Sequence, residues 1–352
     1  MKLFLIMLFL LCFPYNSDAE FFERINENII SIRAEGMGHA GVALHWGNAS
    51  GVLSNPALIS FQRGISYNYI NRGTSSFFYK SYSDIIMSWN GIGFYFAKHP
   101  FGAKGNELEV HSSSGIRSIK YNKESAGISG NMVDLLDRFT NIPLDYIDEY
   151  LEVSVGSTRT SVLRTGSNEY NDKYSEYNYG LHILLTPINT IDKSSVNIMG
   201  GYRMNLAYGK SKLTDYLSDS QSQHNYYNSG WSLYSETGLP RVVSSIFENR
   251  LSWLSDSLTP FFAFGYSSQY SGGNFRWGSG WELSIANSIH FRQGSYDVNE
   301  TRRYNTSGIG LSFDIGDCFG VKWDKATVPF VTGEDIILEG WSIWVNAVEL
   351  FN

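Results

Sequence analysis

The fold class of this chain is decided by one stretch, Gly308-Ile309-Gly310-Leu311-Ser312-Phe313-Asp314-Ile315. Apolar side chains occupy every second position, and glycine, serine or aspartate fill the positions between them. Because successive side chains of a β-strand point to opposite faces, this stretch predicts a strand with one apolar and one polar face.

The same alternation recurs along most of the chain. Val196 to Tyr208 and Trp281 to Phe291 each keep an apolar face opposite a polar one, with Asn287 as a polar exception on the apolar face. Asp84 to Ala97 predicts a hairpin, because Asn90-Gly91 suits a tight two-residue turn. Alternation is therefore the dominant regularity of the sequence.

Runs of this kind predict about fourteen strands between Gly64 and Phe351. A soluble β-sandwich or propeller would alternate too, but these runs reach 11 to 13 residues, against about 5 to 6 for an ordinary strand. The last run, Trp341 to Phe351, resembles the final strand that outer-membrane barrels present to their assembly machinery, although Asn352 follows it and Glu349 falls on its apolar face. The expected fold is an all-β, transmembrane antiparallel β-barrel over residues 62–352.

Composition agrees with a strand-rich chain. Trp, Tyr and Phe number 9, 23 and 22 and make up 15% of the 352 residues, and 34 glycines stand against 8 prolines. The formal net charge of -7 gives no support for nucleic-acid binding. Two cysteines, Cys12 and Cys318, are too few for a disulfide framework or a cysteine metal cluster.

The first residues resemble a secretory leader. Lys2 precedes an apolar run from Leu3 to Phe13, and Ser17 and Ala19 suit cleavage after Ala19, so residues 1–19 are the expected signal peptide. A lipoprotein is the lesser alternative, because Cys12 does not follow small residues. Downstream there is no apolar run of the roughly 18 residues that a membrane helix needs, which leaves a closed barrel as the way to span a membrane.

Residues 20–61 do not alternate. They combine glycines with small residues and end in the turn-forming pair Asn55-Pro56, which predicts a segment that packs closely against other backbone. It is either a plug inside the barrel or a simple periplasmic extension. Asn55-Pro56-Ala57 is likewise either a gating element or only a turn before the first strand.

The stretches Arg33 to Ala43 and Gly47 to Ile59 resemble the hatch of the long-chain fatty acid transporter (FadL) family, in which a small-residue segment leads into an Asn-Pro-Ala motif before the first strand. The resemblance implies a 14-stranded outer-membrane barrel, plugged by its hatch, that takes up hydrophobic molecules passively, without a cofactor. It also implies a lateral exit into the bilayer beside a kinked strand. The hatch residues it singles out are Gly36, Gly38, Gly41, Asn55, Pro56 and Ala57.

The chain is short for this family, so its loops are expected to be reduced. The candidate insertion is residues 123–149, where Met132, Leu135, Leu136 and Phe139 follow helical spacing. It is either a ligand-gathering loop or a plain helical cap, on a side of the membrane that depends on the strand count.

The sequence gives little support for an enzyme. The seven histidines show no metal-ligand spacing, and no nucleophile or phosphate-binding motif is present. His182 and Arg203 fall on polar faces and are candidate lumen contacts for a ligand, although solvation, or pairing of Arg203 with a lumen acid, is the simpler expectation. A hydrolase that uses the polar-face histidines is a minor alternative.

Two rival functions remain open besides uptake of fatty acids or similar hydrophobic compounds. One is a hatched barrel that serves protein secretion or attachment, and the other is a polar porin. The expected partners are hydrophobic small molecules, outer-membrane lipids and the barrel assembly machinery, with the protein as a monomer. An apolar lumen beside the hatch would favour hydrophobic uptake, whereas a polar lumen would favour secretion.

Overall fold

The computed structural model describes residues 31–46, 54–62, 64–73, 81–89, 91–99, 107–112, 115–140, 150–166, 171–191, 200–217, 223–240, 258–271, 275–298, 302–315, 318–329 and 335–346. The expected signal peptide, the last residues of the C-terminal strand and Glu349 lie outside these ranges.

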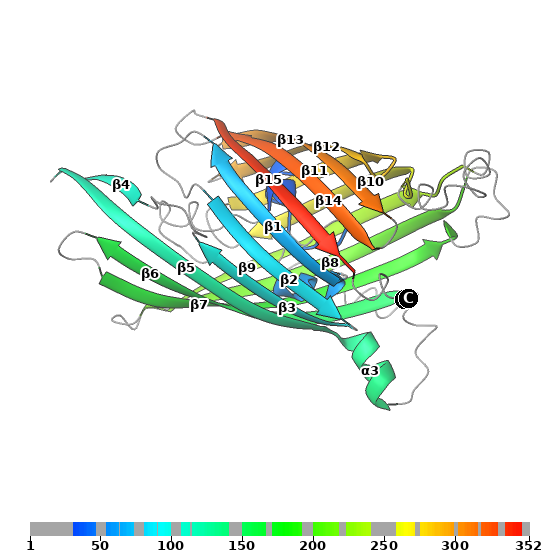
Figure 1. Ribbon diagram of the computed structural model, residues 1–352, viewed down its shortest axis with the longest axis horizontal. Helices are drawn as coiled ribbons and strands as arrows, with labels where there is room; N and C mark the ends of the chain where they lie inside the picture. The colour runs from blue at the N-terminus through cyan, green and yellow to red at the C-terminus, as the bar shows by residue number, and fades with distance from the viewer. Residues whose placement is uncertain are drawn as a thin grey trace.

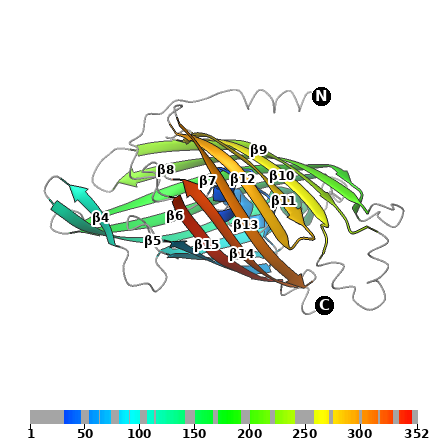
Figure 2. The same cartoon turned by 90° about the horizontal axis from the view of Figure 1, so that it is seen from above.

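Fourteen strands form a closed antiparallel barrel (Figures 1 and 2). They are β1 (Gly64–Gly73), β2 (Ser81–Trp89), β3 (Ile92–His99), β5 (Gly115–Asn131), β6 (Leu151–Gly166), β7 (Asn171–Asn189), β8 (Tyr202–Leu217), β9 (Gln223–Thr237), β10 (Phe262–Ser271), β11 (Phe275–Ile285), β12 (Ile289–Val298), β13 (Arg302–Ile315), β14 (Phe319–Pro329) and β15 (Asp335–Val345). The first and last of them close the ring, with Ile65 opposite Val345 and Gly73 opposite Ile337. The predicted all-β barrel and its strand number are confirmed.

A fifteenth strand, β4 (Glu107–Ser112), stands outside the ring. It forms a hairpin with the first residues of β5, from Glu107 opposite Lys120 to Ser112 opposite Gly115. The second half of β5 continues the ring by pairing with β3, from His99 opposite Lys123 to Ile92 opposite Gly130.

The barrel wall is higher on one side than on the other. We call the end where β1 begins and β15 ends the base, and the opposite end the rim. Strands β5 to β9 have 15 to 19 residues, whereas β1 to β3 have 8 to 10. A membrane-spanning strand needs about 9 to 11 residues, so β5 to β9 are longer than one span, and at the rim they extend beyond β1 to β3 (Figure 1).

Outward side chains form an apolar belt. On β13, Ile309, Leu311, Phe313 and Ile315 are between 36% and 52% exposed, whereas Gly310 between them faces inward and is buried. The same belt includes Phe94, Phe96, Phe264, Phe291, Trp341 and Ile343. A continuous apolar outer surface of this kind is what bilayer lipid covers in a transmembrane barrel.

Two sequence predictions are corrected in detail. Trp281 to Phe291 is not one strand, because Ala286 and Asn287, both with φ of 48°, make a tight turn between β11 and β12. Asn287 therefore breaks the pattern as a turn residue. The expected helical insertion begins later than residue 123: Lys123 to Asn131 still belongs to β5, and helix α3 (Met132–Thr140) follows at the base.

Helix α3 lies at the base, the end of the barrel where β15 ends, and β4 lies at the opposite end (Figure 1). In the described part of the chain, no helix is both long and apolar enough to cross a membrane.

Candidate functional site

The hatch consists of two described segments, residues 31–46 and 54–62, and both lie inside the ring of strands (Figures 1 and 2). The first segment begins with helix α2 (Ile32–Gly36), whose N-terminus is capped by Ser31: its Oγ accepts a hydrogen bond of 2.9 Å from the N–H of Ala34. The second is the 3₁₀ helix η1 (Pro56–Phe61). Helix α2 packs on β12 to β15, and η1 packs on β2, β3 and β5 to β7, so the two segments contact different parts of the wall, separated on one side by β1 alone.

Asn55 connects three parts of the molecule through one fully buried amide. Its Oδ1 accepts the N–H of Ala57 at 3.1 Å, which caps η1. Its Nδ2 donates to the carbonyl oxygens of Val42 at 2.8 Å and Leu181 at 3.0 Å. The side chain thereby holds η1, the first hatch segment and strand β7 together.

Wall glycines let the hatch backbone approach the sheet directly. At five of them a Cβ atom would lie between 2.0 and 2.6 Å from a hatch backbone atom: Gly156, Gly209, Gly278, Gly280 and Gly294. Real Cβ atoms do not come this close to backbone, so no other residue fits without movement of the hatch. We call these five positions the glycine girdle.

The hatch glycines differ in what they require. Gly38 has φ of 69°, and a Cβ there would lie 2.3 Å from the carbonyl oxygen of Ser295. At Gly36 the nearest atom would be 3.4 Å away, an ordinary van der Waals contact. The N–H groups of Gly38 and Gly41 donate to Thr306 Oγ1 and Gln269 Oε1, each at 3.0 Å. Of Gly36 and Gly38, Gly38 is thus the one that fits no larger residue.

A buried charge cluster attaches the hatch to the wall. Arg33, 3% exposed, donates from Nε to Glu282 Oε2 at 2.7 Å and from Nη2 to Glu282 Oε1, and a third hydrogen bond runs from Nη1 to the carbonyl oxygen of Trp46. Glu282, 1% exposed, also accepts from Arg292 Nε at 2.5 Å. Arg292 continues to Asp324 at 2.6 Å.

Lys322 completes this cluster, with Nζ 3.6 Å from Asp324 Oδ2. We name Arg33, Glu282, Arg292, Lys322 and Asp324 the latch. Removing one partner of a buried ion pair is costly because the other charge stays buried. Sequence reasoning did not single out the latch, since Arg33 and Glu282 are 249 positions apart.

The two predicted lumen contacts have different surroundings. Arg203 lies at the base end of β8 and pairs with Glu236, with Nη1 3.2 Å from Oε1. Pairing with a lumen acid, one of the simpler expectations, is therefore what the structure shows. His182 is fully buried beside Phe61, with ring centroids 4.8 Å apart.

His45 brings the hatch next to His182, with ring centroids 5.9 Å apart. Burial, with His182 beside it, holds the pKa of His45 well below its ordinary value of 6.5. His45 is therefore neutral at neutral pH. In the described ranges no group of three or more His, Cys, Asp or Glu side chains could hold a metal ion.

Part of the lumen is apolar. Inward side chains of β1 to β3, β12, β14 and β15 form a buried cluster together with one residue from each hatch segment, Ile32 and Ile59. Its wall members are Ile70, Ile86, Tyr95, Ala97, Tyr296, Ala326, Val328, Ile336 and Leu338. We call this the apolar stripe. It lies on the side of the barrel with short strands, whereas serine, threonine and asparagine line the inner face of β5 to β9.

No protein-family model matches this chain, and no curated protein matches it either. Among solved structures it is similar to the toluene transporter TodX of Pseudomonas putida, with a TM-score of 0.44 and 10% identity over 94% of this chain and 99% of that one. The monoaromatic hydrocarbon channel CymD gives 0.45 and 9% over 90% and 97%. A FadL homologue of Pseudomonas aeruginosa gives 0.38 and 10% over 89% and 96%.

Proposed function

We propose that this protein is an outer-membrane channel for passive uptake of hydrophobic molecules, gated by its hatch. The observation that carries the proposal is the apolar stripe, because it reaches the hatch at Ile32 and Ile59 and lies opposite a wall lined largely by serine, threonine and asparagine. A hydrophobic solute stays out of water when it moves along such a surface. Long-chain fatty acids, hydrocarbons and similar lipids are the substrate class that this lining favours.

The same arrangement disfavours the two rivals. A polar porin needs a water-filled passage, whereas the glycine girdle brings hatch and wall backbones into direct contact. A secretion role would not require an apolar stripe beside the hatch. The channel needs no cofactor, and its partners are its solutes, the lipids of the outer membrane and the machinery that inserts the barrel.

A lateral exit is part of the proposal. In the described residues, β2 and β3 pair continuously from Ser83 opposite Lys98 to Trp89 opposite Ile92, so no gap is open between them. The hatch lies against this wall at Gly93, where a Cβ would be 2.6 Å from Ile59 Cγ2. Exit toward the bilayer therefore requires η1 to move away from β3.

A reversible tether tests whether the hatch must move. Ser60 in η1 and Ser154 in β6 have their Oγ atoms 3.0 Å apart, which places two cysteines close to disulfide distance. The double variant Ser60→Cys/Ser154→Cys is expected to lose uptake of a radiolabelled fatty acid or aromatic hydrocarbon when oxidised, and to regain it on reduction.

The matched control joins two wall strands and does not involve the hatch. Ser125 Oγ and Thr160 Oγ1 are 2.8 Å apart on β5 and β6, so Ser125→Cys/Thr160→Cys should form an equivalent disulfide and keep its uptake. Normal uptake by the oxidised hatch tether would refute hatch gating. Loss of uptake in both variants would point to the wall instead.

A further inference from the structure

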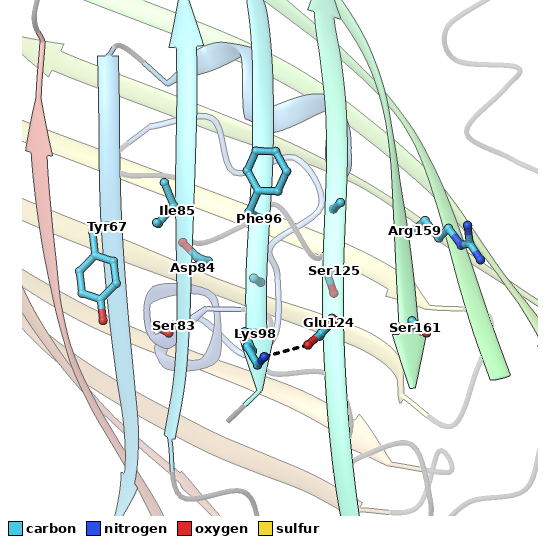
Figure 3. A pocket seen from close by; sticks show the side chains of 12 residues that line it. Tyr67, Ser83, Asp84, Ile85, Phe96, Lys98, Glu124, Ser125, Arg159 and Ser161 are labelled. Atoms are coloured by element: carbon cyan, nitrogen blue, oxygen red, sulfur yellow. Dashed lines mark ion pairs between the residues drawn. The ribbon is translucent and has the colours of Figure 1, made fainter. Parts of the chain in front are cut away.

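A pocket of about 480 Å³ lies on the outward side of the wall, over β1, β2, β3, β5 and β6 (Figure 3). The register of these strands sets Tyr67, Ile85, Phe96 and Ala126 side by side in one row. Tyr67, Ile85 and Phe96 are between 39% and 46% exposed. This row is the apolar floor of the pocket, and it belongs to the belt that faces lipid.

The hollow arises from side-chain size. Ala126 continues the row of Phe96, and Ser83 and Ser161 lie in the next row toward the rim, so three small residues stand among large ones. The small side chains at these three positions therefore create the pocket.

Charged groups border the pocket in the next row toward the rim and at the β6 end of the floor row. Lys98 and Glu124 form an ion pair, with Nζ 2.9 Å from Oε1 and both side chains at least half exposed. Arg159, in the row of Ala126, holds its guanidinium 5.7 Å from the ring centroid of Tyr177. Figure 3 shows Lys98 and Arg159 on either side of the strand that carries Glu124. Among the outward side chains, two cations and one carboxylate leave one net positive charge beside the apolar floor; the second carboxylate at the pocket, Asp84, is buried and accepts a hydrogen bond from the inward Asn68.

We propose that this pocket binds a phosphorylated, acylated lipid of the rim-side leaflet. The acyl chain would lie on the row of Tyr67, Ile85 and Phe96, and the phosphate would be bound by Arg159 and by the donors of Lys98 that Glu124 does not use. The apolar floor suits the chain of an anionic lipid, and the cations at its border suit the head. The volume falls within the roughly 300–1,000 Å³ of ligand pockets.

Charge complementarity decides between occupants of this surface. Lipid surrounds the belt, so a lipid reaches the site from every side without crossing water. Arg and Lys favour phosphate over an uncharged head through charge-assisted hydrogen bonds. The proposal rests on the membrane position of the barrel and not on transport, so the two can fail separately.

Native mass spectrometry of the full barrel in detergent tests it, with a diacyl phosphatidic acid and a phosphate-free diacylglycerol as probes. The wild type is expected to retain one phosphatidic acid and to prefer it over diacylglycerol. Lys98→Gln/Arg159→Gln should lower this retention at least tenfold. Glu124→Gln should raise it, because the competing carboxylate is gone.

Lys325 supplies the matched control. It faces outward on β14, opposite Glu339 and on another part of the wall, so Lys325→Gln should leave retention unchanged. Ala126→Trp fills the pocket from the lipid side without touching the lumen, and it should abolish retention even if the double variant fails to fold.

Equal retention of both probes, or retention unchanged in Ala126→Trp, would mean ordinary surrounding lipid and would overturn the proposal. Displacement of the phosphatidic acid by a neutral hydrocarbon substrate would overturn it as well, because the pocket would then belong to the uptake route. Uptake is measured separately on the same variants.

Discussion

Replacing Glu282 by Gln should release the hatch while the barrel stays closed. The variant removes one of the two carboxylates of the latch and leaves its three cations, Arg33, Arg292 and Lys322, in place. Arg33 loses both charge-assisted hydrogen bonds that join the hatch to the wall, and the amide oxygen replaces only one of them.

Breaking a buried pair in this way costs about 3–5 kcal/mol. We take about 3 kcal/mol, since Gln still accepts one hydrogen bond, and this corresponds to roughly a hundredfold larger population of the released hatch. Arg33→Met should act less strongly, because two cations and two carboxylates then remain and balance.

Hydrogen exchange read by mass spectrometry measures this population. Amides in residues 31–46 should exchange up to about a hundredfold faster in Glu282→Gln, while those of β11 and β12 keep their protection. Glu236→Gln is the matched control, because Glu236 pairs with Arg203 on the wall and with no hatch residue in the hydrogen bonds and ion pairs described. Unchanged exchange in the hatch, or equal acceleration in β11 and β12, would show that the latch does not hold the hatch.

Three further predictions concern the hatch. Gly38→Ala should weaken the packing of the hatch on the wall and accelerate hydrogen exchange in residues 31–46, because the Cβ would meet the carbonyl oxygen of Ser295. Gly36→Ala should change the exchange little, and equal effects of the two variants would contradict the steric reasoning. Asn55→Ala should lower hydrophobic uptake while heat-modifiable migration on gels shows an assembled barrel, because η1 and its Ile59 lose their position on the apolar stripe; normal uptake would exclude a gating role. Lowering the pH from 7 to 5 should accelerate hydrogen exchange in the hatch. Burial lowers the pKa of His45 in the seated hatch, so His45 is protonated more readily when the hatch is released, and the seated state loses stability as the pH falls below 6.5. His45→Gln should reduce this pH dependence.

Alternation made the barrel predictable, because lipid outside and polar groups inside impose opposite demands on neighbouring positions. It worked best at Ile309 to Ile315, where no turn interrupts the pattern. It misled at Asn287, since a tight turn of three residues keeps the apolar residues on either side in phase. At residues 123–131 the helical spacing further on concealed the end of β5.

The candidate site was predictable only where local chemistry determines it. Asn55 before a proline at the start of a short helix is a capping pattern, and its amide oxygen accepts a hydrogen bond from the N–H of Ala57. Its contacts to Val42 and Leu181 depend on how the hatch lies in the barrel. The latch depends on this even more, because Arg33 and Glu282 become partners only when the ring closes around them.

The glycine girdle also bears on how the protein is made. The backbone of residues 37–42 and 56 lies very close to β6, β8, β11 and β12. If the hatch entered a finished barrel, it would have to move past the inward side chains of each of these strands. The ring closes where β1, directly after the hatch in sequence, meets β15. Biogenesis therefore favours an order in which the strands assemble around a hatch already in position, and a wall glycine changed to alanine should be detected first as slow maturation of the nascent barrel.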